Sequence, residues 1–233
     1  VREYHLPADV AAKVNYTGYL DQRARLQAVY AHPTPLLMSL DPPPGRLALC
    51  LVGGGQDGAR LAEAFARATL PPETNGVIVT GPFMPRAARQ HLRVLDAIKP
   101  RLRVLEFVDE PIHLLAQADD VIAMGGYNTA CEILSFERHA LIVPRVRPRH
   151  EQLIRAQRLR DLGLLEMLHP DELNPRALTQ WLFRDKGSVP PMREQVDLEG
   201  LTRLPHLAEK VTMAPDGAAW YQRTEGRFRC VEQ

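Results

Sequence analysis

Two glycine-rich turns of this sequence have the spacing of phosphate-binding loops. The first, at residues 53–58, reads Gly-Gly-Gly-Gln-Asp-Gly and contains the pattern GxGxxG. The second, at residues 125–129, combines two glycines with a tyrosine, an amide and a hydroxyl. Glycine lets the backbone approach a phosphate closely, and the N-terminus of a following helix offers free N–H groups and the positive end of a dipole. Both turns therefore predict binding of a phosphorylated ligand.

The first glycine turn has two other interpretations. In a dinucleotide-binding domain, an acidic residue about 20 positions further on, at the end of the second strand, binds the ribose. Here that region reads Val79-Thr80-Gly81-Pro82 and contains no carboxylate, which argues against NAD or FAD. A tight strand-to-helix turn that binds no ligand is the second alternative.

A glutamate follows the second glycine turn. Glu132 lies three or four residues into the helix expected there, where its carboxylate can accept hydrogen bonds from both hydroxyls of a ribose. Alternatively, Thr129 and Glu132 form only a capping box, Thr-x-x-Glu, with Asn128 or Thr129 as the cap of the helix. Two glycine-rich strand-to-helix turns in one domain favour a nucleotide diphosphate as the ligand.

Apolar runs and helical patterns alternate around these turns and predict the elements that position them. Short apolar runs predict strands at residues 47–52, 76–80, 102–108, 120–124 and 140–143. Helices are expected at residues 59–70, 85–98, 112–118, 128–136, 150–162 and 171–183, the last capped by Asp171. This alternation predicts an α/β fold with a doubly wound, Rossmann-like parallel sheet. The ligand of such a sheet lies outside the carboxyl ends of the strands, where both glycine turns fall.

A longer set of residues resembles the C-terminal half of a GT-B glycosyltransferase. The stretches that carry the resemblance are Phe107-Val108, residues 115–121, residues 125–132, Val143-Pro144 and Glu151-Gln152. Residues 53–58 are similar to the first glycine loop of the same family. That family is of the glycosyltransferase family 28 type. It includes the transferase that adds N-acetylglucosamine to the peptidoglycan lipid intermediate. The likeness spans roughly residues 15–185.

The resemblance implies a UDP-sugar ligand, expected to be a UDP-N-acetylhexosamine, which is a donor substrate and not a cofactor. It implies that the backbone at Phe107 and Val108 meets the uracil and that Glu132 binds the ribose hydroxyls. The residues that it places at the diphosphate and the sugar are Gly54, Gly55, Gln56, Gly125, Gly126, Tyr127, Asn128, Thr129, Glu151 and Gln152. The base that activates the acceptor hydroxyl is implied to belong to an N-terminal half, on the same chain or on a partner subunit.

Arginines are concentrated between residues 145 and 160, although the whole chain has a net charge of only +1. Planar guanidinium groups suit a diphosphate or an anionic acceptor. The arginines expected on the ligand side of the sheet are Arg145, Arg147 and Arg149. Those expected on a solvated helix face are Arg155, Arg158 and Arg160.

Two further residues near the expected site are ambiguous. His150, at the start of a predicted helix, can assist the leaving group or serve only as a polar cap. Asp57 departs from the family's first loop, and a carboxylate beside phosphates is electrostatically unfavourable unless its side chain points away. Arg149 and His150 also depart from the family's pattern, which leaves the identity of the donor sugar open.

The expected organisation has three parts. Residues 1–45 form an interdomain segment, residues 46–185 the α/β domain, and residues 186–233 a tail that packs back on an N-terminal domain. The absence of an initiator Met suggests the back part of a longer protein. Two alternative functions of the same fold are a UDP-sugar epimerase and a non-catalytic nucleotide-sugar-binding subunit. The acceptor, a glycan, a lipid-linked molecule or a small molecule, is not identified.

Composition and charge exclude several other classes. The 233 residues are 45% apolar and 24% charged, which is typical of a folded globular protein. The near-neutral charge argues against nucleic-acid binding, and no apolar run approaches the roughly 20 residues of a membrane helix. The three cysteines form no CxxC pair, and no acidic cluster predicts a metal. The expected location is the cytoplasm, with peripheral membrane attachment left open.

Overall fold

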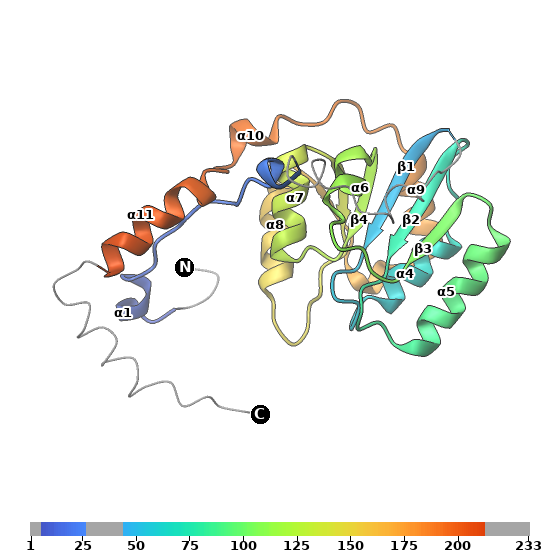
Figure 1. Ribbon diagram of the computed structural model, residues 1–233, viewed down its shortest axis with the longest axis horizontal. Helices are drawn as coiled ribbons and strands as arrows, with labels where there is room; N and C mark the ends of the chain where they lie inside the picture. Colours follow the sequence, from blue (N-terminus) through green and yellow to red (C-terminus); the bar gives the residue numbers. More distant parts are fainter. Residues whose placement is uncertain (1–5, 27–43, 213–233) are drawn as a thin grey trace.

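One sheet of six parallel strands organises the chain (Figure 1). The computed structural model describes residues 6–26 and 44–212. The strands are β1 (Arg46–Leu51), β2 (Thr74–Val79), β3 (Leu102–Leu105), β4 (Asp120–Ala123), β5 (His139–Ile142) and β6 (Glu166–Met167). Their order is β3-β2-β1-β4-β5-β6, and each neighbouring pair is parallel. This order reverses direction between β1 and β4, so the predicted doubly wound fold is confirmed.

Helices cover both faces of the sheet (Figure 1). On one face pack α4 (Ala59–Arg67), α5 (Arg86–Ile98) and α9 (Pro175–Phe183). On the other face pack α6 (Ile112–Gln117), α7 (Tyr127–Phe136) and α8 (Glu151–Asp161). Each of these helices falls within a predicted helical range or within a residue of it.

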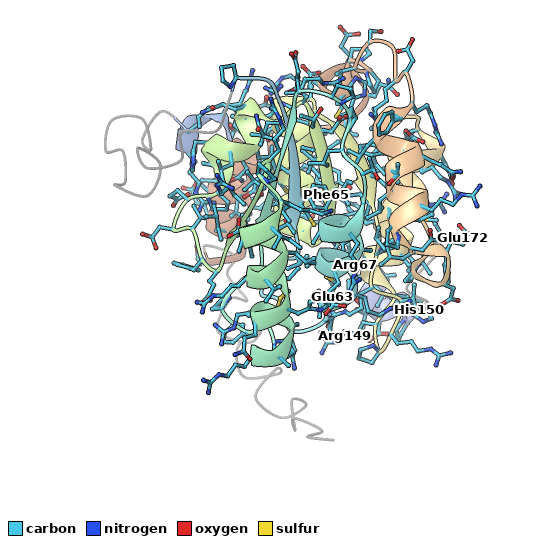
Figure 2. All side chains as sticks on the ribbon, turned by 90° about the vertical axis from the view of Figure 1, so that its right-hand side faces the viewer. Glu63, Phe65, Arg67, Arg149, His150 and Glu172 are labelled. Carbon is cyan, nitrogen blue, oxygen red and sulfur yellow. The ribbon has the colours of Figure 1, made fainter. Side chains whose placement is uncertain are left out.

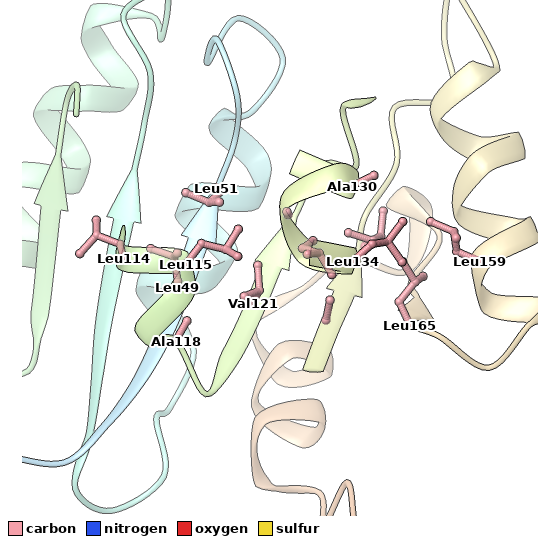
Figure 3. Close-up of a cluster of buried hydrophobic side chains, with 14 of the residues drawn as sticks. Leu49, Leu51, Leu114, Leu115, Ala118, Val121, Ala130, Leu134, Leu159 and Leu165 are labelled. Atoms are coloured by element: carbon pink, nitrogen blue, oxygen red, sulfur yellow. The ribbon is translucent and has the colours of Figure 1, made fainter. Parts of the chain in front are cut away.

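Two hydrophobic cores lie on the two faces because alternate residues of a strand point in opposite directions. In β1, Leu49 and Leu51 belong to the core under α6, α7 and α8, whereas Ala48 and Cys50 belong to the core under α4 and α9. Figure 3 shows the first of these cores, where Leu49 and Leu51 lie beside Leu115 of α6. Strands buried on both faces need apolar residues at successive positions, which explains why continuous apolar runs mark this sheet.

The predicted cap of the last domain helix is wrong. α9 begins at Pro175 rather than near Asp171, because Asn174 is its N-cap. The Asn174 side-chain oxygen accepts the backbone N–H of Ala177 at 2.9 Å. Asp171 instead lies in a separate 3₁₀ helix, η2 (Pro170–Glu172). A proline at the first helical position with an amide cap before it is a stronger start signal than an isolated aspartate.

Two strands also differ from their predictions. β3 ends at Leu105, three residues earlier than the apolar pattern indicated, because the chain leaves the sheet there. β6 was not predicted, since it pairs only Glu166 and Met167 with β5. Two residues are too few to produce a periodic pattern in the sequence.

Segments from both ends of the described chain pair with each other. The N–H of Tyr19 donates to the carbonyl of Asp197 (2.8 Å), and the N–H of Gly200 donates to the carbonyl of Tyr19 (3.0 Å). α11 (Gly200–Thr212) lies within the expected tail, and α1 (Ala8–Ala11) lies on the same side of the sheet (Figure 1). Between α9 and α11, Met192 of α10 (Met192–Gln195) is fully buried in the core that contains α7.

A buried ion pair attaches the segment after α9 to the sheet. Lys186 Nζ lies 3.1 Å from a carboxylate oxygen of Asp120, and the two side chains are 6% and 2% exposed. Arg46 Nη2 lies 3.3 Å from the other oxygen of Asp120, and the Lys186 ammonium lies 4.4 Å from the centre of the Trp181 ring. These residues stand at the amino ends of β1 and β4, opposite the glycine turns. Removal of Asp120 would leave the buried Lys186 charge without this carboxylate, whereas removal of Lys186 would leave Asp120 with Arg46 alone.

Candidate functional site

Both glycine turns open into one cavity at the carboxyl edge of the sheet, where β1 and β4 end. This glycine cavity has a volume of about 260 Å³. The predicted site residues that line it are Gly54, Gly55, Gln56, Gly125, Gly126, Thr129 and Gln152. Asp57, Phe83 and Arg145 also line it. The cavity therefore joins two turns that lie about 70 residues apart in the sequence, at the switch point where doubly wound sheets bind ligands.

Glycine occupies positions 55 and 126 for different physical reasons. Gly55 has a φ of +90°, and a Cβ at this position would lie 2.1 Å from the carbonyl oxygen of Thr80, so the turn itself requires glycine. Gly126 has a φ of −56°, and a Cβ there would meet no atom within 4 Å. The described structure does not require a glycine at position 126. Its missing side chain leaves room in the cavity for a ligand.

Two helices begin at the glycine cavity. α4 follows its N-cap Gly58, and α7 follows its N-cap Gly126, and no side chain caps either helix. The alternative of a Thr129–Glu132 capping box is wrong, because α7 begins at Tyr127 and places Thr129 inside its first turn. The first N–H groups of both helices are thus available to an anion.

Glu132 lies one turn further along α7 and does not line the glycine cavity. Its side chain is buried, with 7% of the residue exposed. Burial raises the pKa of Glu132 to about 7, with Glu110 acting in the same direction and Arg25 opposing it. Arg25 and Glu110 form an ion pair of 2.7 Å with each other. A carboxyl group whose pKa lies near neutral pH can lose its proton there, and the resulting carboxylate can accept hydrogen bonds from hydroxyl groups.

Tyr127 and Arg155 hold the second glycine turn in place. The ring of Tyr127 stacks on Tyr19 with centroids 6.1 Å apart, and its hydroxyl donates to the carbonyl of Gly18 at 3.4 Å. The Arg155 guanidinium lies 5.4 Å from the centre of the Tyr127 ring and donates to the carbonyl of Gly125 at 3.1 Å. The prediction that Arg155 lies on a solvated helix face is therefore wrong. Tyr127, a predicted ligand contact, packs on the segment around Tyr19 instead of lining the cavity.

Arg145 is the cation of the glycine cavity. Its guanidinium lies 3.0 Å from a carboxylate oxygen of Asp57 and 3.5 Å from one of Glu151. The side-chain oxygen of Gln152 accepts the backbone N–H of Arg145 at 3.0 Å. Asp57 is thus neutralised by a neighbouring arginine, which resolves the unfavourable charge that its position in the loop implied. Of the predicted sugar-binding pair, Glu151 thus contacts the guanidinium of Arg145 and Gln152 its backbone.

Phe83 was missed by the sequence analysis. Its N–H donates to the carbonyl of Gly54 at 2.9 Å, and its side chain, 73% exposed, lines the glycine cavity. It follows the Gly81-Pro82 turn after β2, so a search of the residues after every strand could have found it. The predicted uracil contacts lie after β3 and outside the cavity lining: Phe107 is exposed, whereas Val108 is buried.

The predicted residues Asn128, Arg149 and His150 are exposed and do not line the glycine cavity. Arg149 and His150 lie near each other at one end of the molecule, in the loop before α8 (Figure 2). His150 is the N-cap of α8, yet its side chain makes no capping hydrogen bond. Arg158 and Arg160 are exposed on α8, as expected.

Within residues 6–26 and 44–212, no group of three or more His, Cys, Asp or Glu side chains is arranged to hold a metal ion. In the same part of the chain, no helix is long and apolar enough to cross a membrane.

Sequence comparison places this chain among glycosyltransferases. The family described as glycosyltransferase family 28 C-terminal domain matches residues 49–185. One similar protein is the UDP-N-acetylglucosamine--N-acetylmuramyl-(pentapeptide) pyrophosphoryl-undecaprenol N-acetylglucosamine transferase of Mannheimia succiniciproducens, 29% identical over 143 residues. The protein of the same name from Rubrobacter xylanophilus is 27% identical over 142 residues. These matches cover 59% and 60% of this chain, but only 39% of each relative.

Solved structures show the same fold at lower identity. MurG of Acinetobacter baumannii superposes with a TM-score of 0.58 and 20% identity, over 73% of this chain and 51% of the other. The calicheamicin glycosyltransferase CalG4 gives a TM-score of 0.57 and 18% identity, over 75% of this chain and 44% of the other. The chain thus spans about two fifths of the length of its curated relatives. Because the family model covers more than half of the chain, from within β1 through α9, this chain belongs to the glycosyltransferase family 28 C-terminal domain family.

Proposed function

We propose that this chain is the donor-binding half of a glycosyltransferase that uses a UDP-sugar, with a UDP-N-acetylhexosamine as the expected donor. The glycine cavity is the observation that carries the proposal. Two backbone turns and two helix N-termini without side-chain caps converge there with the guanidinium of Arg145. Each of these features favours an anion, and a diphosphate presents two adjacent negative charges.

The remaining parts of the donor are assigned from the position of the residues around this cavity. Glu132, one turn beyond Thr129 on α7, is assigned to the ribose hydroxyls. The backbone at Phe107 and Val108 is assigned to the uracil on the family resemblance; it follows β3, two strands from β1, at the same edge of the sheet. The two named bacterial relatives are N-acetylglucosamine transferases by name, which supports an N-acetylhexosamine as the sugar.

The proposed reaction is a direct substitution at the anomeric carbon. The acceptor hydroxyl oxygen forms a bond to that carbon, while the bond from the carbon to the diphosphate oxygen breaks and UDP leaves with the electron pair. The hydroxyl proton goes to a base on the N-terminal acceptor half or partner subunit. This chain stabilises the departing diphosphate with the N–H groups of α4 and α7 and with Arg145. The reaction is proposed to take place in the cytoplasm.

A thermal unfolding experiment with nucleotides tests the proposal. At a UDP concentration about 100 times the Kd, binding stabilises a folded protein by about 2.7 kcal/mol. For a chain of this size, we expect the melting temperature to rise by about 5–10 °C. NADH should cause no rise, and ADP or GDP a smaller one. No rise with UDP would overturn the proposal, and an equal rise with ADP and GDP would overturn the assignment of the uracil.

A further inference from the structure

A second cavity lies on the other side of the Asp57–Arg145 ion pair. This arginine cavity has a volume of about 570 Å³, within the range of roughly 300–1,000 Å³ that small-molecule sites have. It shares Asp57, Met124 and Arg145 with the glycine cavity, so the two are adjacent. A group attached to a ligand in the glycine cavity can therefore extend into the arginine cavity.

Basic side chains outnumber carboxylates in the lining of the arginine cavity, which also contains apolar residues. The basic residues that line it are Arg60, Arg145, Arg147, His150 and His169. Two carboxylates line it as well, but each already contacts a basic neighbour: Asp57 pairs with Arg145 at 3.0 Å, and Asp171 lies 3.4 Å from His169. Among the described residues, Arg60 and Arg147 have no carboxylate partner. Within the described part of the chain, Arg60 donates only to the carbonyl oxygen of Pro170, at 3.3 Å.

Helix ends add to this positive potential. The arginine cavity is bordered by the start of α4, through Arg60 and Leu61, and by the start of α8, through His150 and Leu153. α4 has 9 residues and α8 has 11, and no side chain caps the start of either helix. The positive ends of both helix dipoles thus reinforce the arginines.

We propose that the arginine cavity binds a second anionic group, a carboxylate or a phosphate, beyond the donor diphosphate. This inference rests on the proposed function, which places the diphosphate in the glycine cavity. Arg60 and Arg147 come from α4 and from the loop before α8. Guanidinium groups from two separate elements suit an anion with several oxygen atoms. The acceptor can carry this group, and so can the transferred sugar if it is an acidic derivative of the expected N-acetylhexosamine; the two sources share the same chemistry.

Calorimetry with two donors that differ only in charge tests the first source. UDP-glucuronic acid carries a carboxylate where UDP-glucose carries a hydroxymethyl group. If the sugar bears the anion, the full chain should bind UDP-glucuronic acid at least about ten-fold more tightly than UDP-glucose. Arg147→Gln should reduce this preference to less than about two-fold. Arg60→Gln, a change on α4, should also reduce it.

Titration of inorganic phosphate into the UDP-saturated chain tests the second source. If the acceptor bears the anion, the donor preference is absent, but phosphate binds and Arg147→Gln weakens this binding about ten-fold. Arg176→Gln is the matched control, because Arg176 is exposed on α9, lines neither cavity and carries the same charge. It should change neither measurement.

The results separate the two proposals. If neither the donor preference nor phosphate binding is observed, or if Arg176→Gln weakens binding as much as Arg147→Gln does, the anion site is overturned. If UDP itself does not bind, the proposed function fails instead. Phosphate titrated without UDP still tests the arginine cavity in that case, and the loss of its binding in Arg147→Gln would support the anion site alone.

Discussion

Glu132→Gln tests the reasoning about the buried carboxyl group most directly. The ordinary pKa of a glutamate is 4.5, and burial raises that of Glu132 to about 7. Between these two values, the unfolded chain loses the proton while the folded chain keeps it. Stability therefore falls as the pH rises through this window, and it is constant above it. The difference between the two pKa values corresponds to about 3 kcal/mol, since one pKa unit equals about 1.4 kcal/mol.

Glutamine has no proton to lose, so Glu132→Gln should remove this penalty. In denaturant unfolding at pH 8, the variant should have a free energy of unfolding higher than that of the unaltered chain by up to about 3 kcal/mol. The advantage should disappear near pH 4.5. A variant that is less stable at pH 8 would show that the carboxylate has favourable partners in the folded state, and it would refute the raised pKa.

The same substitution tests the assignment of Glu132 to the ribose. Only the ionised carboxylate accepts hydrogen bonds from both hydroxyls, and its ionised fraction rises about ten-fold between pH 6 and pH 8 when the pKa is about 7. Calorimetry with UDP-N-acetylglucosamine, whose diphosphate does not titrate in this range, should show affinity about ten-fold higher at pH 8. In Glu132→Gln, affinity should be weaker at pH 8 and independent of pH. A pH-independent affinity in the unaltered chain would refute the assignment.

Four other substitutions have clear expected outcomes. Gly126→Ala should change the free energy of unfolding by less than about 1 kcal/mol but weaken UDP binding in calorimetry. Gly55→Ala should destabilise the chain, because the added Cβ would collide with a backbone oxygen. Equal stability of the two variants would contradict this distinction. Arg145→Gln should weaken binding of UDP about ten-fold and leave binding of uridine unchanged; a loss for both ligands would remove Arg145 from the diphosphate. Lys186→Met should lower the free energy of unfolding, measured in urea, by about 3–5 kcal/mol, because Asp120 would lose its buried partner. A loss below about 1 kcal/mol would show that Arg46 alone is enough to compensate the charge of Asp120.

Most of the fold could be predicted because its signals are local. β1, β2 and β4 are short apolar runs, and each is buried at most or all of its positions. The two glycine turns were also predictable, since the backbone conformations of Gly55 and Gly125, one in each turn, favour glycine. The errors fall where two local signals compete, as with Asp171 and Asn174, or where the element is as short as β6.

The side chains of the candidate site were harder to predict, because tertiary contacts determine their positions. Arg145 contacts Asp57, which is 88 residues earlier in the chain, and Arg155 contacts the carbonyl of Gly125, 30 residues earlier. Helical periodicity predicts a solvated position for Arg155 on α8, but it cannot show that Tyr127 and Gly125 contact this side chain. The stacked pair of Tyr19 and Tyr127, which brings the N-terminal segment over α7, has no signature in the sequence.

The position of Asp57 shows how a site for anions can contain a carboxylate. Arg145 is 31% exposed and Asp57 48% exposed, so their ion pair is screened by water and contributes at most about 1 kcal/mol. Such a pair is strong enough to orient the guanidinium between the two cavities and weak enough to exchange. A diphosphate carries more charge than one carboxylate and also binds the N–H groups of α4 and α7, so it can displace Asp57 from Arg145. Asp57→Asn should therefore strengthen UDP binding, and weaker binding by this variant would show that Asp57 is needed to position Arg145.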